Sequence, residues 1–391
     1  MDPAIASPYG APDGLWALAV KDETVVALIP MDVLNPSVLE IPVRDAGGRW
    51  ATPGLVDSHT HLVFAGSRAA EWEMRLAGVS YSEIARRGGG ILNSVKATRA
   101  ASEDELLALA LPRAKALAAE GVTSVEIKSG YGLTLADEMK MLRVARRIGE
   151  QLPLDVSPTL LAAHAVPPEF SSTDVYIDHI IRDILPAAKG FAEAVDAFCE
   201  GIAFSAAQCE RLFTAAKAHG FAIKAHAEQL TLQRGAEAVA RHSGWSADHL
   251  EFLDEQGVNA LRAAGTVAVL LPGSFYFLRE TQKPPVAALR TAGVPMAVAT
   301  DFNPGTSPFA SLRLAMNQAC VLFGLTPEEA LRGATVHAAQ ALGRGARLGT
   351  LTPGKRADFL LWDVAHPAEI VCSLGTNPLV ERVVRGKVSH V

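Results

Sequence analysis

The sequence contains few cysteines and no long apolar run. Its four cysteines, Cys199, Cys209, Cys320 and Cys372, form no C-x-x-C pair, which favours buried free thiols over disulfides or a zinc knuckle. No stretch approaches the roughly 20 consecutive apolar residues that a membrane-spanning helix needs. The N-terminus lacks the basic start and apolar segment of a signal peptide. From these absences we expect a soluble cytoplasmic protein with no membrane partner.

Positive charge is also scarce, and it is not clustered. The formal net charge is −6, and no stripe of lysines and arginines with interleaved aromatic residues is present. This pattern argues against a nucleic-acid partner and favours a small-molecule substrate. Hydrophobic residues make up 49% of the 391 positions and charged residues only 20%, which indicates a large folded core.

The middle of the chain repeats one pattern eight times. Each repeat is an apolar run rich in β-branched residues, then a polar residue, a turn, and in most cases a stretch rich in Ala, Leu, Glu and Arg. The apolar runs span residues 55–62, 124–128, 156–164, 194–200, 222–226, 246–250, 267–271 and 296–301. Helices are predicted over 102–120, 135–150, 206–218, 233–242, 254–264, 309–323 and 327–342, the first with a capping box at Ser102 and Glu105. Strands that alternate with helices pair in parallel, so we predict an α/β fold with a TIM-like (β/α)8 barrel.

The two ends of the chain have a different character from the middle. Short apolar runs at 15–20 and 24–29 are broken by Asp, Gly and Pro, which is typical of hairpin strands. The stretches 348–363 and 379–384 look similar. We therefore predict a small composite β domain from residues 1–50 and 347–391, and a barrel domain over residues 51–346.

Polar residues end the predicted barrel strands, and in such a barrel these ends form one rim that carries the active site. The residues expected there are His59, His61, Lys128, Tyr131, His164, Glu200, His226, His249 and Asp301. His59 and His61 are two positions apart, so in a strand their side chains point the same way. A single histidine is more often structural, but five histidines and an aspartate on one rim favour a metal centre.

Several motifs carry a resemblance to a known family. They include PGLVDSHTHLVFAGSR at 53–68, EIKSGYG at 126–132, AHAVPP at 163–168, HAEQ at 226–229, SADH at 246–249 and ATDFNPGT at 299–306. With these motifs the chain resembles the amidohydrolase superfamily of metal-dependent hydrolases. It is most similar to those members that hydrolyse the ring amide of 4-imidazolone-5-propanoate to N-formimidoyl-L-glutamate in histidine degradation. The resemblance covers about residues 50 to 360, whereas residues 1–45 show little of the pattern.

The resemblance implies a set of site residues, matched position by position. It makes His59, His61, His226 and Asp301 the ligands of one Zn²⁺ or Fe ion per chain, and it gives catalytic roles to Asp301 and His249. The implied substrate-binding residues are Arg68, Tyr131, His164, Gln229, Asn303, Gly305 and Thr306. A homodimer is implied by the family alone.

The residues themselves add two arguments about this site. Two-metal relatives commonly need a bridging modified lysine after strand four; residues 194–201 contain none, and Lys128 is the nearest candidate, so one metal is favoured. Arg68 could bind a carboxylate through two parallel N–H bonds. We hypothesise that Asp301 moves the proton of the attacking water and that His249 stabilises the carbonyl oxygen.

Two other interpretations remain open from the sequence. A ring deaminase of the same superfamily would use the same metal ligands but would not need Arg68 to meet a carboxylate. A catalytically inactive barrel that serves as a scaffold is a third possibility. The complete set of histidines with Asp301 argues against the scaffold, because such polar groups are costly to keep together without a function.

Overall fold

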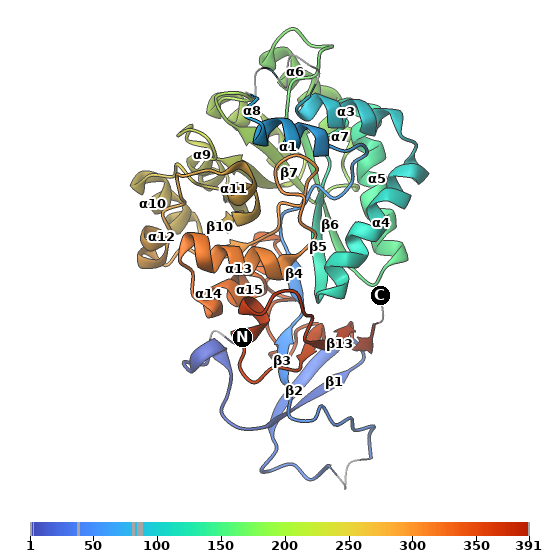
Figure 1. The fold of residues 1–391 in the computed structure, drawn as a ribbon, viewed down its shortest axis with the longest axis vertical. Helices are drawn as coiled ribbons and strands as arrows, with labels where there is room; N and C mark the ends of the chain where they lie inside the picture. The colour runs from blue at the N-terminus through green and yellow to red at the C-terminus, as the bar shows by residue number, and fades with distance from the viewer. Residues whose placement is uncertain (1, 3, 37–39, 80–82, 84–88, 390–391) are drawn as a thin grey trace.

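A barrel of eight parallel strands forms the body of the computed structural model, which describes residues 2, 4–36, 40–79, 83 and 89–389 (Figure 1). The strands pair side by side in chain order, and each predicted apolar run overlaps one of them. They are β4 (Leu55–Asp57), β5 (Val122–Lys128), β6 (Asp155–Ala163), β7 (Ala194–Cys199), β8 (Ala222–Ala227), β9 (Ser246–His249), β10 (Val267–Leu270) and β11 (Met296–Val298). The predicted (β/α)8 class is confirmed.

The barrel closes between its first and last strands through residues that lie just beyond β4 and β11. The backbone N–H of His61 donates to the carbonyl of Phe302 (2.9 Å), and the N–H of Asp301 donates to the carbonyl of His59 (3.0 Å). Below these bonds, the buried Asp57 carboxylate accepts hydrogen bonds from the backbone and hydroxyl of Thr300 (3.1 and 2.7 Å). The closing seam therefore places the segments that follow β4 and β11, and the polar residues that they carry, beside each other.

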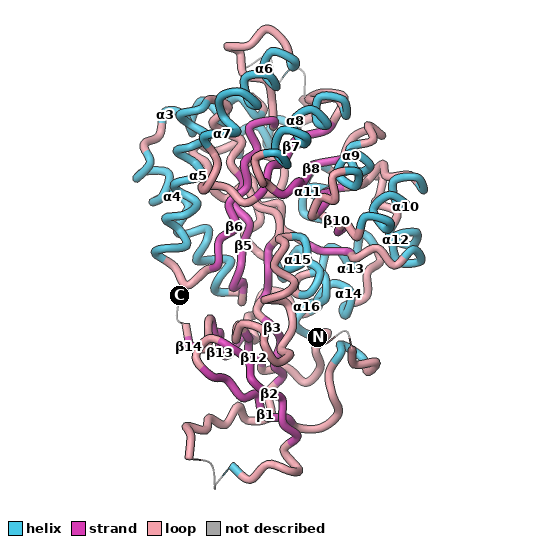
Figure 2. The backbone as a smooth tube through the Cα atoms, turned by 180° about the vertical axis from the view of Figure 1, so that it is seen from behind, coloured by secondary structure: helices cyan, strands magenta, loops and turns pink. Residues whose placement is uncertain are grey.

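Helices surround the strands, and Figure 2 shows the same arrangement from behind. The helices are α1 (Ala69–Leu76), α3 (Ile91–Ala100), α4 (Glu103–Ala119), α5 (Leu135–Gln151), α6 (Thr173–His179), α7 (Leu185–Ala187), α8 (Ala206–Ala218), α9 (Gly235–Arg241), α10 (Glu255–Ala264), α11 (Pro272–Leu278), α12 (Val286–Ala292), α13 (Leu312–Phe323), α14 (Pro327–Gly333), α15 (Val336–Ala341) and α16 (Glu369–Cys372). The predicted capping box is present. The Ser102 hydroxyl accepts from the backbone N–H of Glu105 (3.2 Å), and the backbone N–H of Ser102 donates to the Glu105 carboxylate (2.8 Å).

The prediction of one helix over residues 327–342 is wrong. The helix is interrupted between α14 and α15 at Thr335, whose backbone is not helical (φ −133°, ψ −84°). At the break, the carbonyl of Ala334 turns away from the helix and accepts from the backbone N–H of Val56 in β4 (2.8 Å). The helical pattern gives way here because the first barrel strand needs an acceptor at this position.

A small β region lies below the barrel and joins segments from both ends of the chain (Figure 1). β1 (Trp16–Lys21) and β2 (Thr24–Pro30) form an antiparallel hairpin. A second sheet has the order β14 (Lys387–Val388), β13 (Leu379–Val384), β12 (Phe359–Trp362) and β3 (Trp50–Pro53). The predicted β-rich region from both ends is thus confirmed, whereas the proposed domain limits at residues 50 and 347 stay a prediction.

Gly54 connects β3 to β4 and so links the small sheet directly to the barrel. A Cβ atom at this position would lie 2.2 Å from the hydroxyl oxygen of Thr123 in the neighbouring strand β5, so only glycine fits. Among the residues for which coordinates are described, no helix is both long and apolar enough to cross a bilayer.

Trp362 anchors the small sheet, and its substitution tests this role. The side chain is fully buried, and its indole N–H donates to the hydroxyl of Thr52 (2.8 Å). We expect Trp362→Ala to lower the free energy of unfolding by about 3–5 kcal/mol in urea titrations, because it leaves a large cavity. Trp362→Phe, which keeps most of the packing, should cost only about 1–2 kcal/mol. Equal losses in the two variants would contradict this role.

Candidate active site

Four ligand atoms converge at the C-terminal end of the barrel. The Nε2 atoms of His59 and His61 lie 3.3 Å apart, as do those of His61 and His226. Oδ1 of Asp301 lies 3.4 Å from Nε2 of both His59 and His61. The atoms of His59, His61 and Asp301 thus form a triangle with edges of 3.3–3.4 Å. A triangle of this size is one face of a regular tetrahedron whose corners lie about 2.0–2.1 Å from its centre, as the ligands of a four-coordinate zinc ion do. His226 also lies close to His59 and His249, with which it forms another group of donor atoms. This cluster is therefore able to hold a metal ion.

The closing seam of the barrel brings His59, His61 and Asp301 together, and His226 meets them from β8. His59 and His61 follow β4, Asp301 follows β11, and His226 lies near the end of β8. All four side chains are buried. Burial alone would raise the pKa of Asp301, but hydrogen bonds from His59 and His61 hold it well below its usual value. Burial lowers the pKa of His61 to about 4, so at neutral pH this imidazole is neutral and able to bind a metal.

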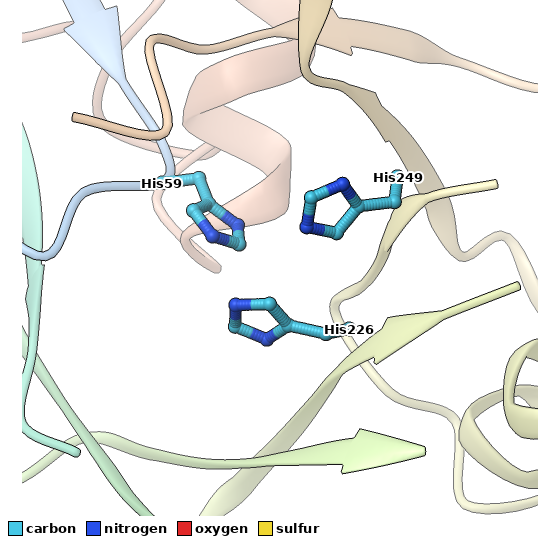
Figure 3. A group of neighbouring side chains, drawn as sticks. All are labelled: His59, His226 and His249. Carbon is cyan, nitrogen blue, oxygen red and sulfur yellow. The ribbon is translucent and has the colours of Figure 1, made fainter. Parts of the chain in front are cut away.

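His249 faces the same centre from the end of β9. In Figure 3 the rings of His59, His226 and His249 point toward one another from three separate segments. The Nδ1 atom of His249 has no hydrogen-bond partner within the described parts of the chain. The backbone is left-handed at His249 (φ 83°) and again at Leu250 (φ 76°), an arrangement that costs energy in residues other than glycine and is often found at functional sites. Burial lowers the pKa of His249 to about 3, so its ring is neutral.

Buried carboxylates orient two of the imidazoles. Nδ1 of His59 donates to Oδ2 of Asp248 (2.6 Å), and Nδ1 of His226 donates to Oδ1 of Asp196 (3.1 Å). A neutral imidazole with its proton on Nδ1 directs the lone pair of Nε2 at the central cluster. Carboxylate–histidine pairs of this kind fix the ring and increase its basicity toward a metal.

Two lysines lie in the same buried layer beneath the cluster. Nζ of Lys128 contacts Asp196 (2.6 Å) and Glu126 (2.8 Å), and Nζ of Lys224 contacts Glu126 (2.9 Å). Burial alone would lower the pKa of Lys128, but Asp196, Glu126 and Asp248 raise it, so the group is a charged ammonium. His59, Glu126 and Asp248 form a second group of donor atoms close enough to hold a cation. The two ammonium groups already neutralise the carboxylates of that group.

The sequence did not single out most of this layer. Glu126, Asp196, Lys224 and Asp248 lie inside apolar runs, where the pattern predicts a strand and gives no separate sign of a site residue. A signal was present, because Glu126 and Lys128 are two positions apart on β5, as are Lys224 and His226 on β8. Residues at this spacing share one face of a strand, and the side chains of a barrel strand alternate between the interior and the surrounding helices. These polar pairs lie on the interior face.

Tyr131 and His164 form a wall beside the cluster. The ring of His164 stacks on that of His61, with centroids 5.3 Å apart and planes at 21°, and Tyr131 lies 5.5 Å from His164. The loop that carries Tyr131 is shaped by the buried Glu138 carboxylate, which accepts from the backbone N–H groups of Gly132 (2.9 Å) and Leu133 (2.7 Å). Nδ1 of His164 lies 2.9 Å from the carbonyl of Gly130 in the same loop, so both rings are held in place beside His61.

The loop at residues 303–306 lies against Arg68. The Asn303 side chain accepts from the N–H groups of Gly305 (2.8 Å) and Thr306 (2.7 Å) and donates to the carbonyl of Asp301 (2.7 Å), so it shapes the loop. A Cβ atom on Gly305 would lie 2.2 Å from Nη1 of Arg68, which shows how closely the guanidinium approaches. Gln229 is half-buried in the turn that follows β8.

Comparisons with known proteins agree with this geometry. A model of the amidohydrolase family matches residues 50–391. The imidazolonepropionase of Chromobacterium violaceum is 62% identical to this chain over 394 aligned positions, covering 100% of this chain and 95% of that protein. The imidazolonepropionase of Shewanella baltica strain OS223 is 56% identical, covering 100% and 96% of the two chains.

Solved structures share the fold at low sequence identity. The 5-methylcytosine deaminase of Klebsiella pneumoniae with bound 5-fluorocytosine superposes with a TM-score of 0.75 at 18% identity, covering 96% of this chain and 94% of that one. An adenosine deaminase from Xanthomonas campestris with bound zinc gives a TM-score of 0.68 at 20% identity, covering 95% and 88%. At this level of identity the likeness concerns the fold alone.

The orienting role of Asp248 can be tested by metal affinity. Asp248→Asn weakens the acceptor for His59 Nδ1, so we expect the affinity for Zn²⁺ to fall about 10–100-fold in chelator competition. Asp363→Asn, at an exposed aspartate just beyond β12, should leave the affinity unchanged. Equal affinities in the two variants would show that the bond between Asp248 and His59 does not tune the site.

Proposed function

The chain belongs to the amidohydrolase family and, within it, to the imidazolonepropionases, and on this premise we propose how its residues hydrolyse 4-imidazolone-5-propanoate. The reaction is a step of histidine degradation. Water adds to the ring carbonyl carbon, the bond from this carbon to the ring nitrogen breaks, and N-formimidoyl-L-glutamate forms. From the family we also expect a homodimer located in the cytoplasm.

In this proposal His59, His61, His226 and Asp301 hold one ion, Zn²⁺ or Fe. The observation that carries the proposal is the set of 3.3–3.4 Å separations among their ligand atoms. Neutral imidazoles with one carboxylate suit either metal. When bound, the ion supplies Lewis acidity that lowers the pKa of a water molecule toward neutrality. The ion pairs of Lys128 and Lys224 support a single ion, because ammonium groups already balance the second donor group.

Asp301 transfers a proton during hydrolysis of the ring amide, and His249 stabilises the negative charge on the carbonyl oxygen. Asp301 is an ionised carboxylate, so it accepts the proton of the attacking water and delivers it to the departing ring nitrogen. His249 is neutral and donates a hydrogen bond, rather than a proton, to the carbonyl oxygen as negative charge develops there. Gln229 cannot take a proton, so we assign it to contact with the ring and not to general base catalysis.

The remaining residues recognise the substrate. Arg68 binds the propanoate carboxylate with its planar guanidinium. Tyr131 and His164 flank the ring from the wall beside His61. Asn303, Gly305 and Thr306 contact substrate or product from the loop against which Arg68 packs.

Turnover and metal content measured on the same sample test the proposal. With freshly generated 4-imidazolone-5-propanoate, we expect formation of N-formimidoyl-L-glutamate at about one metal ion per chain. Treatment with a chelator should abolish the activity, and added Zn²⁺ or Fe²⁺ should restore it. Bound metal without turnover would overturn the substrate assignment, and turnover that persists after complete metal removal would overturn the metal-dependent mechanism.

Substitution of Asp301 tests the proton transfer. Asp301→Asn keeps an oxygen that can face the metal but cannot accept a proton, so kcat should fall by about a hundredfold to ten-thousandfold. Metal content and thermal unfolding, measured in parallel, separate this loss from loss of the ion or of the fold, and Asp363→Asn serves as the matched control. Activity near that of the wild type would rule out this role of Asp301.

A further inference from the structure

Arg68 is held by a carboxylate to which none of the roles above is assigned. Arg68 precedes the first residue of α1, and Glu71 lies three residues later on that helix. Nε and Nη2 of Arg68 both lie 2.8 Å from Oε2 of Glu71. One edge of the guanidinium is therefore bound by Glu71, while Nη1 lies against Gly305.

Glu71 is itself fixed from its other side. Its Oε2 accepts from the backbone N–H of Gly90 (3.0 Å), and its Oε1 accepts from the side-chain amide of Asn93 (3.1 Å). Gly90 and Asn93 belong to the start of α3, where a carboxylate is also favoured by the helix dipole. Burial alone would raise the pKa of Glu71, but the bonds from Arg68, Asn93 and Gly90 lower it, so the group is ionised.

Helix α1 is anchored over α11 and the 303–306 loop by neighbouring contacts. The ring of Trp72 stacks on Phe277, with centroids 5.7 Å apart and planes at 14°. The guanidinium of Arg75 lies 5.2 Å from the centre of the same Phe277 ring, and its Nη2 donates to the carbonyl of Gly305 (3.2 Å). Arg68 thus lies between a fixed carboxylate and a fixed loop.

We propose that Glu71 is a positioning residue that preorganises Arg68 for the propanoate carboxylate, an inference that rests on the proposed function. An unrestrained arginine loses considerable side-chain entropy when it binds a ligand, and a side chain already held in its bound geometry loses less. The charges also match the substrate. Two guanidinium groups, those of Arg68 and Arg75, with the single Glu71 carboxylate leave one net positive charge for a tail with one negative charge.

A double-mutant cycle separates positioning of Arg68 from a general structural role. Glu71→Gln, Arg68→Met and the double variant are compared for kcat and KM with 4-imidazolone-5-propanoate at matched metal content. We expect Glu71→Gln to raise KM about tenfold with kcat within about twofold of the wild type, because it weakens ground-state and transition-state binding equally. In the Arg68→Met background, which has a high KM of its own, Glu71→Gln should add no further increase.

Two further variants sharpen the test. Glu73→Gln, at an exposed residue of the same helix, should leave KM within about twofold of the wild type. Asn93→Ala removes a support of Glu71 without altering Arg68, so it should raise KM about twofold to fivefold, and only when Arg68 is present. This variant carries the test if Glu71→Gln does not fold.

The outcomes are distinguishable. An unchanged or lowered KM in Glu71→Gln would overturn the inference, and a lowered value would show that Glu71 competes with the substrate for Arg68. An increase of equal size with and without Arg68 would show a structural role alone and would also overturn it. Absence of turnover in the wild type, in contrast, would be a failure of the proposed function itself.

Discussion

Two backbone hydrogen bonds, from His61 to Phe302 and from Asp301 to His59, close the barrel and at the same time bring three of the four proposed metal ligands together. A barrel of parallel strands needs its first and last strands to meet, because an open edge would leave backbone groups unpaired. In this chain the meeting occurs two to four residues beyond the ends of β4 and β11, where three of the ligating side chains lie. The distance between His59 and Asp301 is therefore set by the main chain, and loop conformation has little influence on it.

The buried charges beneath the cluster orient the histidines and are not there to stabilise the fold. Removing Lys128, Lys224 and their carboxylate partners from water has a high desolvation cost, which ion pairing offsets only when the geometry is good. This layer orients the imidazole rings, because Asp196 and Asp248 accept hydrogen bonds from Nδ1 of His226 and His59. A site that must present several lone pairs to one point requires such fixed partners.

Local pattern was enough to predict the barrel and the rim, because strand periodicity and strand-end polarity are properties of neighbouring residues. The inward-facing Asp196 and Asp248 were missed because a single charged residue in an apolar run has no local partner that shows its role. The break at Thr335 depends on a bond between Ala334 and Val56, about 280 positions away in the sequence, so helical periodicity gave no sign of it. Glu71 likewise acquires a role only when Gly90 and Asn93 fold back onto α1.

The pairing of β3 with β12 also governs when the small sheet can form during synthesis. β3 ends at Pro53 and continues through Gly54 into the first barrel strand, yet its antiparallel neighbour begins at Phe359. About 300 residues lie between them, and a ribosome adds about 5–20 residues per second, so β3 waits about 15–60 s for its partner. During that interval β3 has no partner strand, so this sheet cannot form before the chain has been made through β12.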